Sequence, residues 1–367
     1  MFLNECMNNF LSRIRPEIRS MGAYHVVDAT GLIKLDAMEN PYTLPDDLKA
    51  QLAQELAQVA MNRYPIPTYT ALTDELRRYA QIPADKSIIL GNGSDELIAI
   101  LSQAIAKQGE TVTVLAPAPS FVMYKVSALL NHLNVVEIPL NAADFSLDEA
   151  AWLAAIEQHQ PALVYLPFPN NPTGNLFDEA AMRRIIAAAR ESIVVVDEAY
   201  QPFAQASWMA ALAEFEHLLV MRTVSKLGLA GVRLGYMAGG AALISELDKV
   251  RPPYNVNVLT EAVATFVLRH AVVLDEQAGL IRAERARVCE ILAEMPQLRV
   301  FETAANFVLL RLSDDLSADA VFAGMKARGV LVKNMSAAHP LLRNCLRITI
   351  STSQENAAML AALQASL

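Results

Sequence analysis

The stretch HLLVMRTVSKLGLAGVRLG, residues 217–235, joins a short apolar run to a segment rich in glycine and hydroxyl residues. An apolar run of this length predicts a strand buried on both faces, as in a parallel sheet covered by helices. Ligands bind at the carboxyl ends of such strands. Lys226 follows the run, together with Thr223, Ser225 and Arg233. A solvated lysine needs no such neighbours, so Lys226 is a candidate functional residue.

Short β-branched runs alternate with helical patterns on both sides of this stretch. The further runs before it are SIIL (87–90), TVTVL (111–115), NVVEI (134–138), ALVYL (162–166) and IVVVD (193–197). This alternation predicts an α/β fold with a mostly parallel mixed sheet sandwiched by helices. Ser146 and Glu149 are expected to form a capping box at the start of one helix.

The pattern changes near residue 250, where RPPYNVN introduces two prolines. A long helical stretch follows, and further strands are predicted at NFVLLRL (306–312), VLVKN (330–334) and CLRITI (345–350). We predict three parts in the chain. They are an N-terminal segment at 1–45 that packs with the small domain, a large domain at 46–255, and a small C-terminal α+β domain at 256–367.

The composition argues against several classes of protein. The chain has 367 residues and a formal net charge of −9 at pH 7, which argues against a nucleic-acid partner. It has no apolar run of about 18 residues, the length of a membrane span, and no signal-peptide pattern. Cys6, Cys289 and Cys345 are far apart, and the six histidines lack metal-ligand spacing. We expect a cytoplasmic protein without a metal or membrane partner.

Two loops after predicted strands are candidate ligand sites. LGNGSDE (90–96) opens a helix at Ser94 and Asp95, where backbone N–H groups and the helix dipole favour a phosphate. PFPNNPTGN (167–175) predicts a rigid loop that contains Asn171. Taken singly, each could also be an ordinary structural turn.

The motif VVVDEAY, residues 194–200, ends a buried strand at Asp197. A buried carboxylate needs a cationic or hydrogen-bonding partner, and a structural salt bridge is one alternative. Read with the other motifs, Asp197 suits a protonated ring nitrogen, Arg233 a phosphate, and Lys226 an aldehyde that it would hold as a Schiff base. Pyridoxal 5′-phosphate carries all three groups, so we predict it as the cofactor.

These motifs stand in the order and approximate spacing of the fold type I pyridoxal-phosphate-dependent aminotransferases, which the chain resembles over nearly its whole length. Within that superfamily it resembles the histidinol-phosphate aminotransferase family. The stretches that carry the second resemblance are RPEIRSMGAYHV (15–26), KLDAMENPY (34–42), NRYP (62–65), GNGSDELI (91–98) and CLRIT (345–349).

The resemblance implies a role for each candidate residue. Lys226 would bind the cofactor and shuttle a proton, Asp197 would pair with the ring nitrogen, and Tyr200 would contact the ring's phenolic oxygen. The other cofactor contacts would come from Ser94, Asp95, Phe121, Asn171, Thr223, Ser225 and Arg233. Tyr64 would reach the cofactor phosphate of a second subunit, which implies a homodimer with shared active sites.

The substrate side is where the sequence departs from the family. Arg347 would bind the α-carboxylate of the amino donor, and Asn40 and Tyr42 would line the pocket. The family often has arginine where Lys333 stands, so Lys333 or Arg343 would bind a substrate phosphate. The loop after ENPY reads TLPDD where the family often has glycine and serine.

The resemblance implies transamination between L-histidinol phosphate and 2-oxoglutarate, giving imidazole acetol phosphate and L-glutamate, in L-histidine biosynthesis. Two alternatives share the fold: an aromatic or broad-specificity amino-acid aminotransferase, and a threonine-phosphate decarboxylase. A catalytically inactive ligand-binding relative is a third, and the intact set of Lys226, Asp197, Tyr200 and Arg233 argues against it.

Overall fold

A computed structural model of the chain describes the structure of residues 10–23 and 27–367. Cys6 and the end of the stretch RPEIRSMGAYHV, at residues 24–26, lie outside the described residues. The chain divides into two compact units, Met1–Gly31 and Leu32–Leu367. In the described part of the first unit, the helix α2 (Pro16–Ser20) begins with a proline at its first position, where a missing N–H costs nothing.

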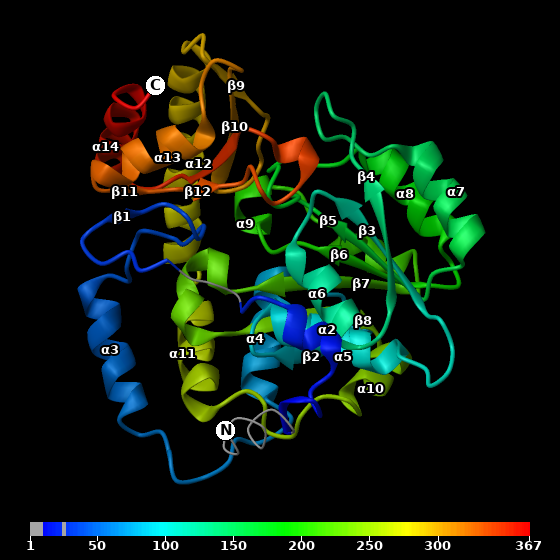
Figure 1. The fold of residues 1–367 in the computed structure, drawn as a ribbon. Coiled ribbons are helices and arrows are strands. Elements are labelled where there is room, and N and C mark those ends of the chain that lie inside the picture. Colours follow the sequence, from blue (N-terminus) through cyan, green and yellow to red (C-terminus); the bar gives the residue numbers. More distant parts are fainter. Residues whose placement is uncertain (1–9, 24–26) are drawn as a thin grey trace, which may run out of the picture. The chain divides into compact units, whose positions relative to one another are not determined.

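A seven-stranded sheet forms the centre of the second unit (Figure 1). Its order is β2 (Lys86–Gly91), β8 (Gly235–Gly240), β7 (Leu218–Thr223), β6 (Ile193–Asp197), β5 (Leu163–Pro167), β3 (Thr113–Ala118) and β4 (Asn134–Pro139). β8 runs antiparallel to both neighbours, and the other pairs are parallel. The predicted α/β fold with a mostly parallel mixed sheet is therefore confirmed, although the glycine-rich β8 was not predicted.

Helices cover both faces of this sheet (Figure 1). They are α4 (Thr70–Ala80), α5 (Ser94–Ile105), α6 (Val122–Leu130), α7 (Glu149–His159), α8 (Glu179–Ala188) and α10 (Ala241–Asp248). The short α9 (Gln201–Ala204) instead places Phe203 in a different apolar cluster. Side chains of a strand alternate between the faces. In β6, Val194 and Val196 join the apolar cluster that includes α4, α7 and α8, whereas Val195 joins the cluster of α5, α6 and α10.

A second, antiparallel sheet lies in the C-terminal part of the chain. Its order is β12 (Lys333–Asn334), β13 (Cys345–Thr349), β10 (Phe307–Leu312) and β9 (Leu298–Val300). The helices α12 (Val272–Ala293), α13 (Ala318–Ala327) and α14 (Ser353–Gln364) pack with it around a separate apolar cluster. This arrangement has the α+β character that the sequence predicts.

The predicted strand VLVKN divides between two sheets. Its first residues form β11 (Val330–Leu331), which pairs in parallel with β1 (Ile33–Lys34), and its last two form β12. Leu35 continues this connection, because its carbonyl oxygen accepts a hydrogen bond from the Thr349 amide. Residues 33–35 are therefore attached to the C-terminal sheet.

The domain boundaries stay a prediction, but apolar packing favours a later division than residue 255. Helix α11 (Val258–Arg269) packs on α4 and on α3 (Asp46–Leu56). Its Phe266 and Leu268 belong to the apolar cluster of the large sheet, and so does Leu274 of α12. From Ala278 onward, α12 contributes to the C-terminal cluster.

One local prediction was wrong. Ser146 and Glu149 do not form a capping box, because Asp148 caps α7 and accepts a hydrogen bond from the Ala151 amide. Aspartate is as good a cap as serine, and Asp148 stands directly before Glu149, the first residue of the helix. Among the described residues, no helix is both long and apolar enough to cross a bilayer.

Candidate active site

The candidate site lies at the carboxyl ends of neighbouring strands. Asp197 is the last residue of β6, and Thr223 is the last residue of β7. The two strands are parallel and adjacent, with Asp197 opposite Met221. A short irregular helical turn, Ser225–Leu229, follows β7 and carries Lys226. The fold therefore places these residues where ligands bind in α/β sheets.

Lys226 is a buried amine among cations. Burial, and then the positive charge of Arg347, lower its pKa to about 8, and Arg233 acts in the same direction. Its Nζ donates a hydrogen bond to the Ala37 carbonyl oxygen at 2.8 Å. A lysine with a pKa near 8 is partly neutral at physiological pH and can act as a nucleophile or base.

Asp197 is a buried carboxylate, with 5% of its surface exposed. Its Oδ2 accepts a hydrogen bond from the Tyr124 hydroxyl at 2.6 Å, and its Oδ1 accepts one from the Ala199 amide at 3.0 Å. Burial raises the pKa of Asp197 to about 6 despite these bonds. A nearby cation would strongly stabilise the ionised form of such a buried carboxylate.

A cradle for an anion forms where α5 begins. Gly93 precedes the helix with φ of +79°, and a Cβ there would lie 2.8 Å from the Nη2 atom of Arg233. Gly235 also borders the cradle, because a Cβ at this position would lie 2.6 Å from the carbonyl carbon of Gly93. Arg233 also lies 3.6 Å from the carboxylate of Asp95. A side chain at either glycine would fill this space.

Hydroxyl groups surround the same cradle. The Ser94 Oγ is buried and has no hydrogen-bond partner among the described residues. The Thr223 hydroxyl donates to the Ser225 Oγ at 3.0 Å. The first turn of a helix also has N–H groups without intrahelical partners. An anion bound here would satisfy Ser94 and these N–H groups together.

Arg347 of β13 connects the C-terminal sheet to the site. Its guanidinium donates to the Asn171 Oδ1 at 2.6 Å and to the Asp36 carbonyl oxygen at 2.8 Å. It also lies over the Phe307 ring, 5.5 Å from the centroid. The Tyr200 ring packs edge-on against the same Phe307 ring, with the two centroids 5.1 Å apart. The structure therefore brings Arg347, Asn171 and Tyr200 together.

Three further predicted residues lie next to these groups. Asn40 donates from its Nδ2 to the carbonyl oxygen of Leu227, the residue after Lys226, and its Oδ1 accepts the Tyr42 amide. Tyr42 is half-buried, and burial raises the pKa of its phenol. Phe121 directly precedes the first residue of α6, and its ring packs edge-on against the Tyr124 ring with the centroids 5.6 Å apart.

Lys333 lies directly opposite Arg347 in the β12–β13 pair. The remaining two predicted residues are not brought to the site by any described contact. Arg343 is exposed in the turn before β13. Tyr64 is 79% exposed and stacks on Tyr254, with centroids 4.6 Å apart.

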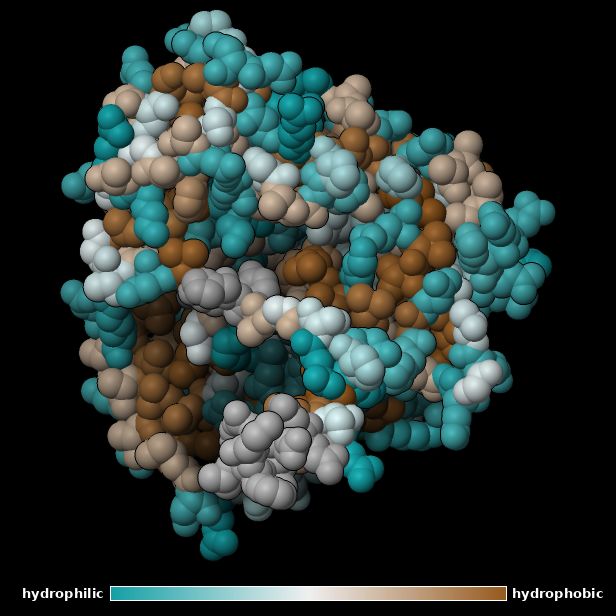
Figure 2. Space-filling model, viewed as in Figure 1, coloured by the Kyte–Doolittle hydropathy of each residue, from teal (hydrophilic) through white to brown (hydrophobic). Residues whose placement is uncertain are grey.

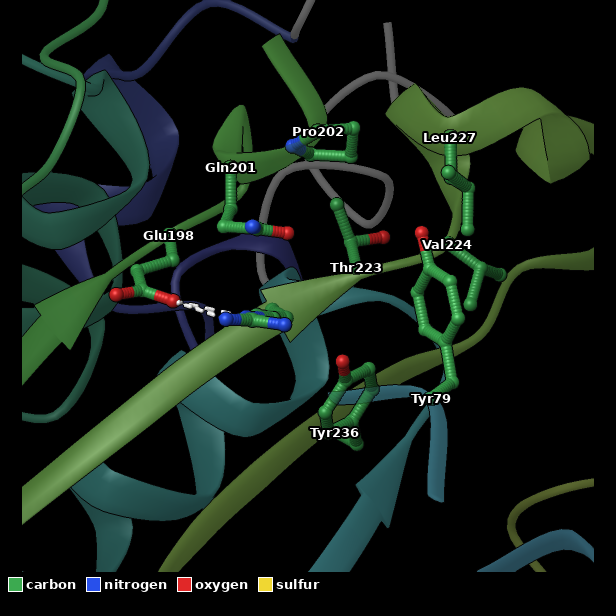
Figure 3. Close-up of a pocket in the computed structure, with 9 residues that line it drawn as sticks. Tyr79, Glu198, Gln201, Pro202, Thr223, Val224, Leu227 and Tyr236 are labelled. Carbon is green, nitrogen blue, oxygen red and sulfur yellow. Dashed lines mark hydrogen bonds and ion pairs between the residues drawn. The ribbon is translucent and has the colours of Figure 1, made fainter. Parts of the chain in front are cut away.

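A buried ion pair behind the site was not predicted. Arg222 and Glu198, the neighbours in sequence of Thr223 and Asp197, are joined at 2.7 Å with their side chains 7% and 0% exposed. Both line a small pocket that Tyr79 and Tyr236 also enter (Figure 3). Glu198 is visible in the sequence as the second residue of the motif DEAY. Its partner Arg222 could be found only from the order of the strands in the sheet.

Pyridoxal phosphate fits this set of groups. The orphan Ser94 hydroxyl and the glycine cradle suit its phosphate, the buried Asp197 suits its ring nitrogen, and the partly neutral Lys226 suits its aldehyde.

Fold and site together define a fold type I enzyme. The chain belongs to the aminotransferase class I and II family, whose sequence model matches residues 30–363. It is 58% identical over 366 residues to histidinol-phosphate aminotransferase 1 of Ralstonia nicotianae, covering 98% of this chain and 96% of that protein. It is also 58% identical over 358 residues to histidinol-phosphate aminotransferase 2 of Cupriavidus pinatubonensis, covering 96% of each. The fold matches the crystal structure of histidinol-phosphate aminotransferase from Sinorhizobium meliloti in complex with pyridoxal 5′-phosphate. That match has a TM-score of 0.82 at 24% identity and covers 97% and 98% of the two chains.

Proposed function

We propose that this chain is a histidinol-phosphate aminotransferase that uses pyridoxal phosphate. The reaction moves the amino group of L-histidinol phosphate to 2-oxoglutarate and forms imidazole acetol phosphate and L-glutamate, in L-histidine biosynthesis. The observation that carries this proposal is the 58% identity, over nearly the full length of both chains, to proteins of that name. The alternatives are not favoured, because the likeness to a threonine-phosphate decarboxylase is 20% in sequence and shows only the fold.

The cofactor, when bound, supplies the electron sink that stabilises negative charge at the substrate's α-carbon. Asp197 would hold the protonated ring nitrogen, and Tyr200 and the Asn171 amide would bind the phenolic oxygen. Lys226 would accept the proton from the substrate's α-carbon, and a pKa of about 8 suits its amine to take up and release that proton.

The remaining cofactor contacts hold the phosphate and the ring in place. Phe121 stacks on the ring. The phosphate would be bound by the side chains of Thr223, Ser225 and Arg233 and by the backbone at Ser94 and Asp95, where α5 begins. A phosphate anchored here would hold the cofactor's aldehyde within reach of Lys226, so the residues that bind the cofactor also position its reactive group.

The substrate side uses the C-terminal sheet. Arg347 binds the α-carboxylate of glutamate as a bidentate fork, and Asn40 and Tyr42 line the pocket. Lys333, on the same strand pair as Arg347, binds the substrate phosphate, and Arg343 is the alternative residue for this role.

We also propose a homodimer in the cytoplasm, with Tyr64 of one subunit reaching the cofactor phosphate of the other. Tyr64 and its stacking partner Tyr254 are exposed, as are Met61 and Ile66 nearby in the chain and Leu259 of α11. Figure 2 shows hydrophobic surface in the region of α3 and α11. Exposed apolar groups gathered in this way are typical of a subunit interface.

The test is an assay of the purified protein with imidazole acetol phosphate and L-glutamate. Formation of 2-oxoglutarate is expected, and the Lys226→Ala variant is expected to lose nearly all turnover and the covalent cofactor while keeping its fold. Asp197→Asn is expected to retain the cofactor but turn over slowly. No product from these substrates, together with good turnover of phenylalanine or tyrosine, or carbon dioxide from threonine phosphate, would contradict the proposal.

A further inference from the structure

Tyr124 is a buried residue that the proposed reaction leaves without a role. It lies in the first turn of α6, and 2% of its surface is exposed. Its hydroxyl donates to the Asp197 Oδ2 at 2.6 Å, and its ring stacks on Tyr165 at 4.2 Å with an angle of 10° between the planes. The ring is therefore fixed by packing, and its hydroxyl is aimed at the carboxylate.

The two hydrogen bonds to Asp197 fix the plane of its carboxylate. The Ala199 amide donates to Oδ1 from two residues along the chain, whereas Tyr124 donates to Oδ2 from another element. Each carboxylate oxygen can accept two hydrogen bonds. Both oxygens can therefore keep these donors and still face a further cation.

We propose that Tyr124 is a positioning residue, whose phenol holds Asp197 in the orientation and the ionised form that the cofactor's ring nitrogen requires. This inference rests on the proposed function in one respect, the pairing of Asp197 with that nitrogen. A carboxylate that accepts a hydrogen bond is a weaker base. The shared proton then stays on the ring nitrogen, and the ring remains an electron sink.

The surroundings of Asp197 make this hydrogen bond necessary. Burial raises the pKa of Asp197, and the negative charges of Asp95 on α5 and of Glu198 raise it further. The hydrogen bonds from Tyr124 and Ala199 lower it. Without the phenol, Asp197 would hold a proton of its own more readily and would bind a pyridinium less well.

The test compares two isosteric variants of the stacked pair. Tyr124→Phe removes the hydroxyl that touches Asp197, and Tyr165→Phe removes a second buried hydroxyl from the neighbouring ring. Affinity of the apoenzyme is measured for pyridoxal phosphate and for its 1-deaza analogue, in which carbon replaces the ring nitrogen. We expect Tyr124→Phe to weaken pyridoxal phosphate binding about tenfold and to leave the analogue's affinity unchanged or improved. Tyr165→Phe is expected to affect neither.

Equal losses for both ligands, a matching loss in Tyr165→Phe, or no loss in Tyr124→Phe would each overturn the proposal. Asp197→Asn tests the pairing of Asp197 with the ring nitrogen by itself. If this pairing exists, the variant should also lose affinity for pyridoxal phosphate and not for the 1-deaza analogue. If it does not, the pairing of Asp197 with the ring nitrogen is wrong and the inference fails with it. The assay uses no substrate, so an error in the proposed substrate would not affect it.

A measurement on the unaltered apoenzyme keeps the proposal testable if Tyr124→Phe does not fold. The phenolic carbon of Tyr124, labelled with carbon-13, is expected to shift in the NMR spectrum as Asp197 takes up its proton near pH 6. Absence of this shift in Asp197→Asn is the control. A Tyr124 signal that does not respond to pH in the unaltered enzyme would overturn the proposal.

Discussion

Lys333 and Arg347 occupy directly opposite positions in the antiparallel pair β12–β13. Residues opposite each other in such a pair project from the same face of the sheet. Arg347 also contacts Asn171 in the candidate site. The face that carries Arg347 toward the site therefore carries Lys333 beside it, whereas Arg343 is exposed in the turn before β13.

This relationship predicts which cation binds the substrate phosphate. Lys333→Ala is expected to raise the KM for imidazole acetol phosphate about tenfold or more, the effect of losing one hydrogen bond between charged groups. Its KM for glutamate, which has no phosphate, should change little. Arg343→Ala is the comparison, with a smaller expected effect. A larger effect from Arg343→Ala on the phosphorylated substrate would reverse the assignment.

The pKa of Lys226 predicts when its amine reacts. A pKa lowered to about 8 means that half of the amine is neutral near pH 8, whereas an ordinary lysine reaches this point near 10.4. In the apoenzyme, the rate of acetylation of Lys226 should rise through pH 8, measured by mass spectrometry of its peptide. Arg347→Met removes a positive charge that lowers this pKa, so the curve should move to higher pH.

Arg285→Met is the matched control for this titration. Its guanidinium is also partly buried, and it binds the carbonyl oxygens of Phe203 and Ala305. The acetylation curve of Lys226 should stay in place in that variant. An identical shift in both variants would mean that a general loosening of the structure, and not the charge of Arg347, controls the amine.

The glycine cradle gives a third prediction. Gly93→Ala places a Cβ 2.8 Å from the Arg233 guanidinium, which must then move away from the phosphate site. The free energy of pyridoxal phosphate binding should weaken by about 1.5–3 kcal/mol, the same loss that we expect for Arg233→Ala. Gly109→Ala has the same φ of +79° and no atom within 4 Å of the new Cβ. It should lose about 1–2 kcal/mol of stability to backbone strain and bind the cofactor normally.

The buried pair Glu198–Arg222 predicts a large effect on stability. Arg222→Met leaves Glu198 buried without its cation and should cost about 3–5 kcal/mol in the urea unfolding of the apoenzyme. Adding Glu198→Gln should recover part of this loss. Lys249→Met, which breaks the exposed pair with Glu246, should cost at most about 1 kcal/mol. Equal losses from the buried and the exposed pair would contradict this explanation.

The large sheet could be predicted from the sequence because most of its strands are continuous apolar runs. β8 could not, since its sequence GYMAGG contains three glycines and resembles a loop. Its glycines serve close packing: a Cβ at Gly239 would lie 2.3 Å from the Leu219 side chain, and Gly235 lies against Gly93. The requirement comes from neighbours that are distant in sequence, so no local pattern reveals it.

The residues of the candidate site also divide into those that the sequence could predict and those that it could not. Asp197, Lys226 and Arg233 stand in short motifs whose residue types already indicate a cofactor. Tyr124 carries no such signal, because its role depends on α6 lying above the end of β6. The carbonyl oxygens of Asp36 and Ala37 were also beyond prediction, since every residue has a carbonyl and only the fold selects these two.

The parallel pairing of β1 with β11 has a consequence for biosynthesis. Ile33 pairs with Val330, so the segment that presents Asp36 and Ala37 is held by chain made almost 300 residues later. A ribosome that has just released Lys226 has therefore produced a lysine that still lacks the burial and the Arg347 charge that lower its pKa. The final surroundings of this amine must therefore wait until Arg347 has left the exit tunnel.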